Sequence, residues 1–313
     1  MGRGEPREPF SDIPPNPHVM ADRGTGGDVM VAVEDPDQVE QLVRTAGDLA
    51  SLGSKTVRLV TVVVKPYDSP FGVFTDETIV REFAADSHEL LEQATAPEGV
   101  EVVRDLVVAR SVAKGIVRAV KREEPDALVI GWDADPRRSD ALLGSTVDSV
   151  LAQAPTDVYV ERIGREAEGV SSVLMPVAGG PHVEAAGRVA TAIAVVNDAT
   201  IRILAVATDG TTEADAKGFA EEAATTVGDV AERGIEVETT VRPGENPTDV
   251  IVAEAESHDV VVLGATRKGP LRGRLVGSVP RRVVRRSGKT VILARDAATV
   301  GGFVGRLSAL LRR

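Results

Sequence analysis

Two patterns of apolar residues alternate along the chain. Short, nearly continuous runs of Val, Ile, Leu and Ala predict strands buried on both faces, and longer segments with apolar residues every three or four positions predict amphipathic helices. The order of these patterns after residue 28 recurs after residue 171, so the chain contains an internal repeat. The predicted strands occupy residues 28–34, 55–64, 99–108, 126–132 and 156–162 in the first copy, and 172–178, 199–208, 234–242, 259–265 and 289–295 in the second.

Helices are expected between these strands. Alternating strands and helices imply a parallel sheet with helices on both faces, because right-handed crossovers place them there. We therefore predict an α/β fold with two tandem five-stranded parallel-sheet domains of the Rossmann-like type, at residues 28–163 and 171–297, joined by the polar linker 164–170. The predicted helices cover residues 37–52, 77–93 and 111–123 in the first copy and 182–196, 213–233 and 247–257 in the second, with a further short helix before each last strand.

Composition narrows the class of protein. The formal charge of −12 disfavours nucleic-acid binding, and the lack of cysteine excludes thiolate metal sites and agrees with a cytoplasmic location. No apolar run approaches the ~20 residues that span a bilayer. Residues 1–27 lack the apolar core of a signal peptide and are predicted to be a disordered tail. Residues 298–313 are predicted to be an amphipathic tail that docks on its own domain or contacts an anionic membrane or a transporter.

The loops after the fourth strands carry the candidate chemistry. They run from Gly131 to Ser145 and from Gly264 to Ser278, have the same length, and both end in Gly-Ser at a helix start. Glycine lets the backbone approach an anion, and the serine adds a hydroxyl beside the free N–H groups of the helix. The alternative is that the glycines turn the chain and the serines are ordinary N-caps. The candidate phosphate-binding residues are Gly264, Arg267, Lys268, Gly277, Ser278 and Val279 in the second copy and Gly131, Gly144 and Ser145 in the first.

The pattern Gly-x2-Gly-x9-Gly-Ser/Thr after the fourth strand resembles the nucleotide loop of the universal stress protein family. The resemblance covers residues 28–162 and 171–296, and it implies the adenine nucleotide alpha hydrolase-like form of the Rossmann-like fold. It also implies binding of ATP or another adenine nucleotide, with Mg²⁺ present only if a nucleotide is bound. The second copy is further similar to stress-protein domains attached to amino-acid transporters.

The sequence departs from the family pattern at defined positions. Arg267 and Ala134 stand where the second loop glycine is expected. The Asp that holds the adenosine at the end of the first strand corresponds to Glu34 or Asp35 in the first copy and to Ala178 in the second. Neither nucleotide site therefore has the complete family pattern.

Charge separates the two loops. Between Gly264 and Lys289 the chain has no acidic residue, whereas the matching region of the first copy has four aspartates against Arg137 and Arg138. A basic cluster on an acidic protein attracts anions at short range, so the second copy is the better predicted phosphate site. The alternative is a solvated basic helix face that pairs with acidic residues of the neighbouring domain. The basic residues are Arg267, Lys268, Arg272, Arg274, Arg281, Arg282, Arg285, Arg286 and Lys289.

The resemblance also implies how the copies assemble. Last strands of two such domains commonly pair across a two-fold axis, so residues 156–162 and 289–295 are expected to pair within one chain, and a homodimer is a further possibility.

Four scattered histidines show no metal-ligand spacing and are predicted to be surface or capping residues: His18, His88, His182 and His258.

We expect a regulatory stress-response protein that binds a nucleotide or other phosphate ligand, chiefly in the second domain, and is not an enzyme. No nucleophile elbow, Walker lysine or recognisable triad supports catalysis, and slow ATP hydrolysis is the weakest hypothesis. The main alternative is a nucleotide-free interaction protein that regulates a partner such as a membrane transporter.

Overall fold

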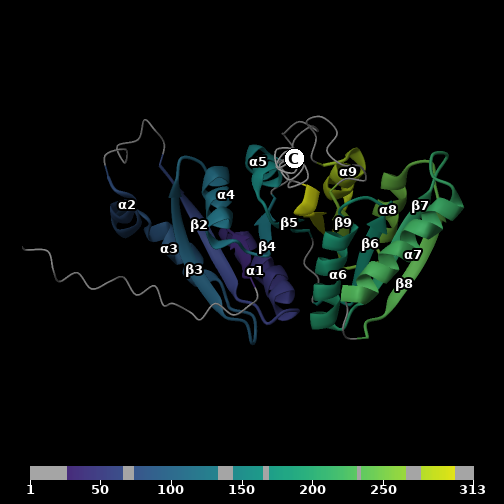
Figure 1. Ribbon diagram of the computed structural model, residues 1–313, viewed down its shortest axis with the longest axis horizontal. Helices are drawn as coiled ribbons and strands as arrows, with labels where there is room; N and C mark the ends of the chain where they lie inside the picture. The colour runs from purple at the N-terminus through teal and green to yellow at the C-terminus, as the bar shows by residue number, and fades with distance from the viewer. Residues whose placement is uncertain are drawn as a thin grey trace, which may run out of the picture.

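The computed structural model describes residues 27–65, 74–132, 144–164, 169–230, 234–265 and 276–299. Its ten strands form one continuous sheet in the order β3-β2-β1-β4-β5-β10-β9-β6-β7-β8. Only β5 and β10 pair antiparallel in this sheet, and the other neighbouring strands are parallel. The first five strands form one half and the last five the other, as Figure 1 shows. The predicted α/β fold with two tandem parallel-sheet domains is confirmed.

The elements agree with the predicted order, with one exception. The strands are β1 (Val29–Ala32), β2 (Val57–Val64), β3 (Val102–Ala109), β4 (Ala127–Gly131), β5 (Asp157–Arg162), β6 (Ser172–Val177), β7 (Thr200–Ala207), β8 (Val237–Pro243), β9 (Val260–Gly264) and β10 (Thr290–Arg295). The helices are α1 (Pro36–Ser51), α2 (Asp76–Phe83), α3 (Ala85–Gln93), α4 (Val112–Glu123), α5 (Ser145–Gln153), α6 (Val183–Asn197), α7 (Glu213–Val230), α8 (Pro247–Ala255) and α9 (Ser278–Arg286).

The exception is the helix predicted over residues 77–93. The structure divides it into α2 and α3 at Ala84, whose φ of −110° and ψ of 26° are not helical. No glycine or proline marks the break in the sequence, so the local pattern predicts one continuous helix. Ile79 on α2 and Leu90 on α3 are both buried, and α3 contacts α1, β2 and β3, whereas α2 contacts β3.

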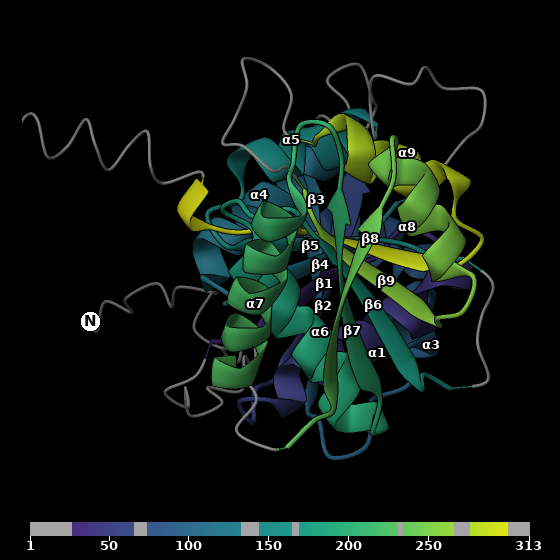
Figure 2. The same ribbon diagram turned by 90° about the vertical axis from the view of Figure 1, so that its right-hand side faces the viewer.

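Helices cover both faces of the sheet (Figures 1 and 2). One apolar cluster contains residues of α1, α3, α6 and α7, and the other contains residues of α4, α5, α8 and α9. Pairing registers are the same in the two halves: Val29 faces Val57 and Ala127, and Val173 faces Ile201 and Val260. The two copies can therefore be compared position by position along the sheet.

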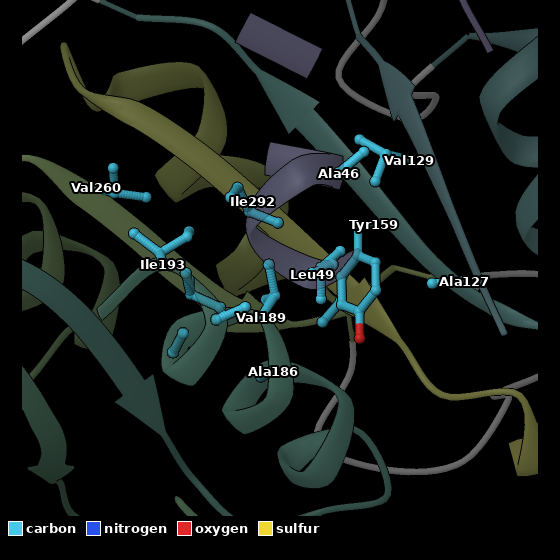
Figure 3. Packing of buried hydrophobic residues seen from close by; sticks show 14 of the residues in the cluster. Ala46, Leu49, Ala127, Val129, Tyr159, Ala186, Val189, Ile193, Val260 and Ile292 are labelled. Atoms are coloured by element: carbon cyan, nitrogen blue, oxygen red, sulfur yellow. The ribbon is translucent and has the colours of Figure 1, made fainter. Parts of the chain in front are cut away.

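The predicted pairing of the two last strands is confirmed. Strands β5 and β10 run antiparallel, with Val160 opposite Leu293, and make the two sheets one. Helices α1 and α6 pack over this seam, where Leu49, Tyr159, Val189, Ile193 and Ile292 gather (Figure 3). Both last strands are thereby internal, and neither exposes an unpaired backbone edge.

The seam also holds polar groups that come from domain 1. Glu161 on β5 is fully buried, and its Oε1 accepts a hydrogen bond of 2.9 Å from Gln41 Nε2 on α1. Asp48 on α1 is also buried, and its Oδ2 accepts from Asn197 Nδ2 of α6 at 3.5 Å. Burial raises the pKa of each carboxyl to about 7. The seam thus contains two carboxyl groups that titrate near neutral pH.

Several expectations concern segments outside the described residues. These are residues 1–26 of the predicted disordered tail, 165–168 of the predicted linker and 300–313 of the predicted amphipathic tail. In the part of the chain that the structure describes, none of the helices combines the length and apolar character needed to cross a membrane, and no three acidic or histidine side chains gather as a metal site.

Candidate functional site

Domain 2 has a cavity of about 180 Å³ beyond the carboxyl ends of its strands. Its walls are mainly apolar, with Leu204 and Leu263 from the sheet and Ile251 from α8. Two predicted site residues line it, Gly264 at the end of β9 and Val279 at the start of α9. Ala178, which stands where the resemblance implies an Asp, is also in the wall. The cavity therefore suits an apolar group, and none of the described residues in its wall offers a carboxylate to a ribose.

The start of α9 provides the polar end of this site. Gly277 is the N-cap residue and forms no side-chain cap bond, so Ser278 is the first helical residue and not the N-cap. The Ser278 side chain is exposed, and the N–H groups of Ser278 and Val279 have no partner among the described residues. Free N–H groups at a helix start attract anions. The interpretation of Ser278 as an ordinary N-cap is wrong, and the same holds for Ser145, which follows the N-cap Gly144.

Close packing explains the glycine at the end of β9. A Cβ on Gly264 would lie 3.0 Å from the Cβ of His182, which is tighter than ordinary van der Waals contact. His182 also lines the cavity, and its Nδ1 accepts a hydrogen bond of 3.1 Å from the N–H of Asp296. Burial lowers the pKa of His182 to about 4, so the ring is neutral and its Nε2 carries the proton.

The predicted roles of the histidines need correction. His182 takes the N-cap position of α6, but its ring is buried and makes no cap bond to that helix. His258 is buried as well, so the surface prediction is wrong for both. Only the sequence Gly-Pro-His before a helix marks His182, and this short motif does not distinguish a cavity wall from a loop. The sequence likewise gave no signal for Thr208 and Thr211, which close a turn beside the cavity.

The basic cluster after β9 is only partly described. Arg281 is buried, and its Nε donates to the carbonyl of Gly277 at 3.4 Å. Arg286 pairs with Asp249 on α8 at 2.6 Å, within the same domain, and Arg282 is exposed. Helix α9 therefore divides its arginines between internal contacts and the surface. Four predicted members lie outside the described residues: Arg267, Lys268, Arg272 and Arg274.

Domain 1 has a larger cavity, of about 360 Å³, at the equivalent place. Among the predicted residues, Glu34, Asp35 and Gly131 line it, while Thr146 and Val147 contribute the start of α5. The two carboxylates differ in their partners. Asp35 caps α1 through its Oδ1, which accepts from the N–H of Asp37 at 3.1 Å.

Glu34 is the carboxylate that remains for a ligand in domain 1. Its side chain has no hydrogen-bond or ion-pair partner among the residues the structure describes, and it lies at the position equivalent to Ala178. Gly144, at the end of the same loop, has a φ of +117° that favours glycine strongly. Ala134, at the missing second glycine, lies outside the described residues.

Comparisons with known proteins agree with the two-domain architecture. The family model for the universal stress protein family matches residues 27–162 and 170–295. A putative universal stress protein from Pseudomonas aeruginosa UCBPP-PA14 has a similar structure, with a TM-score of 0.58, 16% identity and coverage of 91% of this chain and 98% of that one. No curated protein matches the chain significantly.

Two further solved structures share the fold. A universal stress protein from Archaeoglobus fulgidus DSM 4304 has a TM-score of 0.58 and 19% identity, with coverage of 85% of this chain and 97% of that one. The cytoplasmic domain of a prokaryotic cation chloride cotransporter has a TM-score of 0.55 and 13% identity, with coverage of 89% and 99%.

Proposed function

The chain belongs to the universal stress protein family, and from this premise we propose that it is a non-catalytic regulatory module whose second domain binds a nucleotide or another phosphate ligand. One observation carries the proposal. The domain 2 cavity contains Gly264 and Val279 in its wall and ends at the start of α9, where two N–H groups have no partner among the described residues.

The cavity sets how a nucleotide is held. Its volume of about 180 Å³ is below the roughly 300–1,000 Å³ of sites that enclose a whole ligand. It therefore takes the base, while the phosphates lie at the Ser278 hydroxyl and the free N–H groups, near the exposed Arg282. The His182 ring is neutral and adds no charge to the base pocket. Mg²⁺ enters this site only with the phosphates of a nucleotide.

Domain 1 is the second candidate, and Glu34 is the observation that favours it. A carboxylate without a protein partner at the end of β1 is suited to accept hydrogen bonds from ribose hydroxyls. The domain 1 cavity of about 360 Å³ is also large enough to enclose a nucleoside. The two domains thus divide the features of one nucleotide site between them.

A matched pair of variants tests where the phosphate binds. Ser278→Glu and Ser145→Glu each place a carboxylate at the first position of an exposed helix start, where it is compatible with the helix dipole but repels an anion. In titration calorimetry of the full chain with ATP, ADP, AMP and cyclic dinucleotides, we expect Ser278→Glu to weaken binding about tenfold or more. We expect Ser145→Glu to leave it unchanged.

The other outcomes are equally decisive. Loss of binding only in Ser145→Glu assigns the ligand to domain 1, and equal affinities in all three proteins place it away from both helix starts. No binding at millimolar ligand favours the nucleotide-free interaction protein, in which the fold is a scaffold for a partner. A membrane transporter is the partner class to test first, by capture on the full chain with and without residues 299–313. Both proposals assume a cytoplasmic location.

A further inference from the structure

A second hollow in domain 1, of about 370 Å³, lies beyond the carboxyl ends of β2 and β3 and the start of α4. No residue lines both this hollow and the Glu34 cavity. Four of the side chains in its wall are cations and one is a carboxylate. The charged lining residues are Lys65, Asp76, Arg110, Lys114 and Arg118.

Uncharged carbonyl groups hold most of these cations in place. Lys65 Nζ donates to the carbonyl of Phe74 at 2.5 Å, and Arg110 Nη1 donates to the carbonyl of Lys65 at 3.0 Å. Arg118 Nη2 donates to the carbonyl of Val108. A bond to a carbonyl orients the side chain but does not neutralise its charge.

Within the described segments, Lys114 and Arg118 are the cations of this hollow that no ion pair compensates. Asp76 lies 3.7 Å from Lys65, and its side chain is 55% exposed. Neither Lys114 nor Arg118 has a carboxylate partner among those residues. Helix α4 adds its positive end, since its N-cap Ser111 accepts from the N–H of Lys114 at 3.4 Å. The site therefore combines several charged N–H donors with a fixed helix dipole.

The second copy shows that the fold does not need these cations. Strands β2 and β3 pair in the same register as β7 and β8, and N-caps Ser111 and Asn246 occupy equivalent positions. At the places of Lys65, Arg110, Lys114 and Arg118, domain 2 has Asp209, Glu245, Asp249 and Ala253. The same architecture thus tolerates the opposite charge, so the cationic side chains of domain 1 are not a requirement of folding.

From these observations we propose that the hollow bounded by Lys65, Arg110, Lys114 and Arg118 is a binding site for a small metabolite with two or more phosphate groups. Its volume suits such a ligand. Arginine and lysine together provide planar paired donors and a compact ammonium for phosphate oxygens. On a chain of net charge −12, these cations attract a polyanion at short range.

Inorganic pyrophosphate is a suitable probe, in titration calorimetry of the full chain at about 20 mM NaCl, where screening is weak. We expect one saturable site whose Kd rises about tenfold or more in Lys114→Asp, which introduces the domain 2 residue, and in Arg118→Ala. Both residues are exposed, and Lys114 has no ion-pair partner among the described residues, so these variants are expected to fold, which their melting curves check. Asp209→Ala, at the place of Lys65 in domain 2, is the matched control and leaves Kd unchanged.

Two results would overturn the proposal. One is the absence of saturable binding up to about 10 mM pyrophosphate. The other is a Kd for pyrophosphate that stays unchanged in Lys114→Asp and Arg118→Ala. If Ser278→Glu then abolishes binding, pyrophosphate binds at α9 instead. Because Ser278 lies in domain 2, failure of this proposal and failure of the proposed function are separate outcomes.

Discussion

The two sides of the central seam have the same geometry but differ in their buried acids. On the domain 1 side, Asp48 on α1 and Glu161 on β5 are buried acids. The equivalent positions on the domain 2 side are Ala192 on α6 and Ala294 on β10, both fully buried. Gln41, which donates to Glu161, likewise corresponds to Ala185. The two buried acids are therefore specific to the domain 1 side, and they add a dependence on protons.

The buried acids make the free energy of unfolding depend on pH. Burial raises the pKa of Asp48 and Glu161 to about 7, so the folded chain binds protons that the unfolded chain has released. The free energy of unfolding therefore decreases as pH rises from about 4 to about 7, where these groups lose their protons, and is constant beyond. Unlike the usual carboxylate in an ion pair, these acids favour the folded state at mildly acidic pH.

The largest expected effect comes from adding an acid on the apolar side. Ala192→Asp places a carboxyl at the position equivalent to Asp48, without an assigned amide partner like Asn197. Burying an ionised carboxylate without partners destabilises the protein by about 4 kcal/mol at pH 8. Urea denaturation at pH 5 and pH 8 measures it, with a smaller loss expected at pH 5. Equal losses at both pH values would show that crowding, rather than charge, is responsible.

Removing the acids on the domain 1 side is expected to have the opposite pH dependence. The double variant Asp48→Ala and Glu161→Ala gives both positions the alanine that occupies the equivalent positions of domain 2. The decrease in unfolding free energy between pH 4 and pH 7 should shrink by several kcal/mol. Urea denaturation across this pH range gives the slope. An unchanged slope would assign the proton uptake to other groups and remove the proposed asymmetry.

The smallest effect concerns two equivalent arginines. Arg188 on α6 pairs with Asp157 of β5, a buried carboxylate that also accepts from the N–H of Ala297 at 2.8 Å. Arg44 on α1 pairs with the exposed Glu40 at 3.5 Å. We expect Arg188→Ala to lower the unfolding free energy by about 1 kcal/mol at pH 7, because it leaves Asp157 without its cation, and Arg44→Ala to change it by less than about 0.5 kcal/mol. Equal effects of the two variants in urea denaturation would contradict this ranking.

The sequence predicts the fold well because the signals for it are local. Runs of β-branched residues mark each strand, and the repeat fixes their order, so the ten strands follow. The β5–β10 pairing has no such local signal and is predicted from the resemblance to the family. The break at Ala84 does not follow, since no glycine or proline accompanies it.

The site was predictable only in part for the same reason. The Gly-Ser ends of the loops indicate helix starts, and both begin as expected at Ser145 and Ser278. The burial of His182 against Gly264 depends on a close approach of two segments that lie 82 positions apart in the numbering, and no local pattern encodes it. The inverted charge at Lys114 and Asp249 is visible only when both copies are superposed through their strand registers.

Pairing of β5 with β10 within one chain changes what a single mutation does. In a homodimer, every substitution appears twice because symmetry copies it, and a seam with Asp48 and Glu161 would bury both acids from each subunit. In this tandem chain each position occurs once per seam. The seam of this chain therefore buries two carboxyl groups where the corresponding homodimer would bury four. Residues on one side of the seam can change without the same change on the other side.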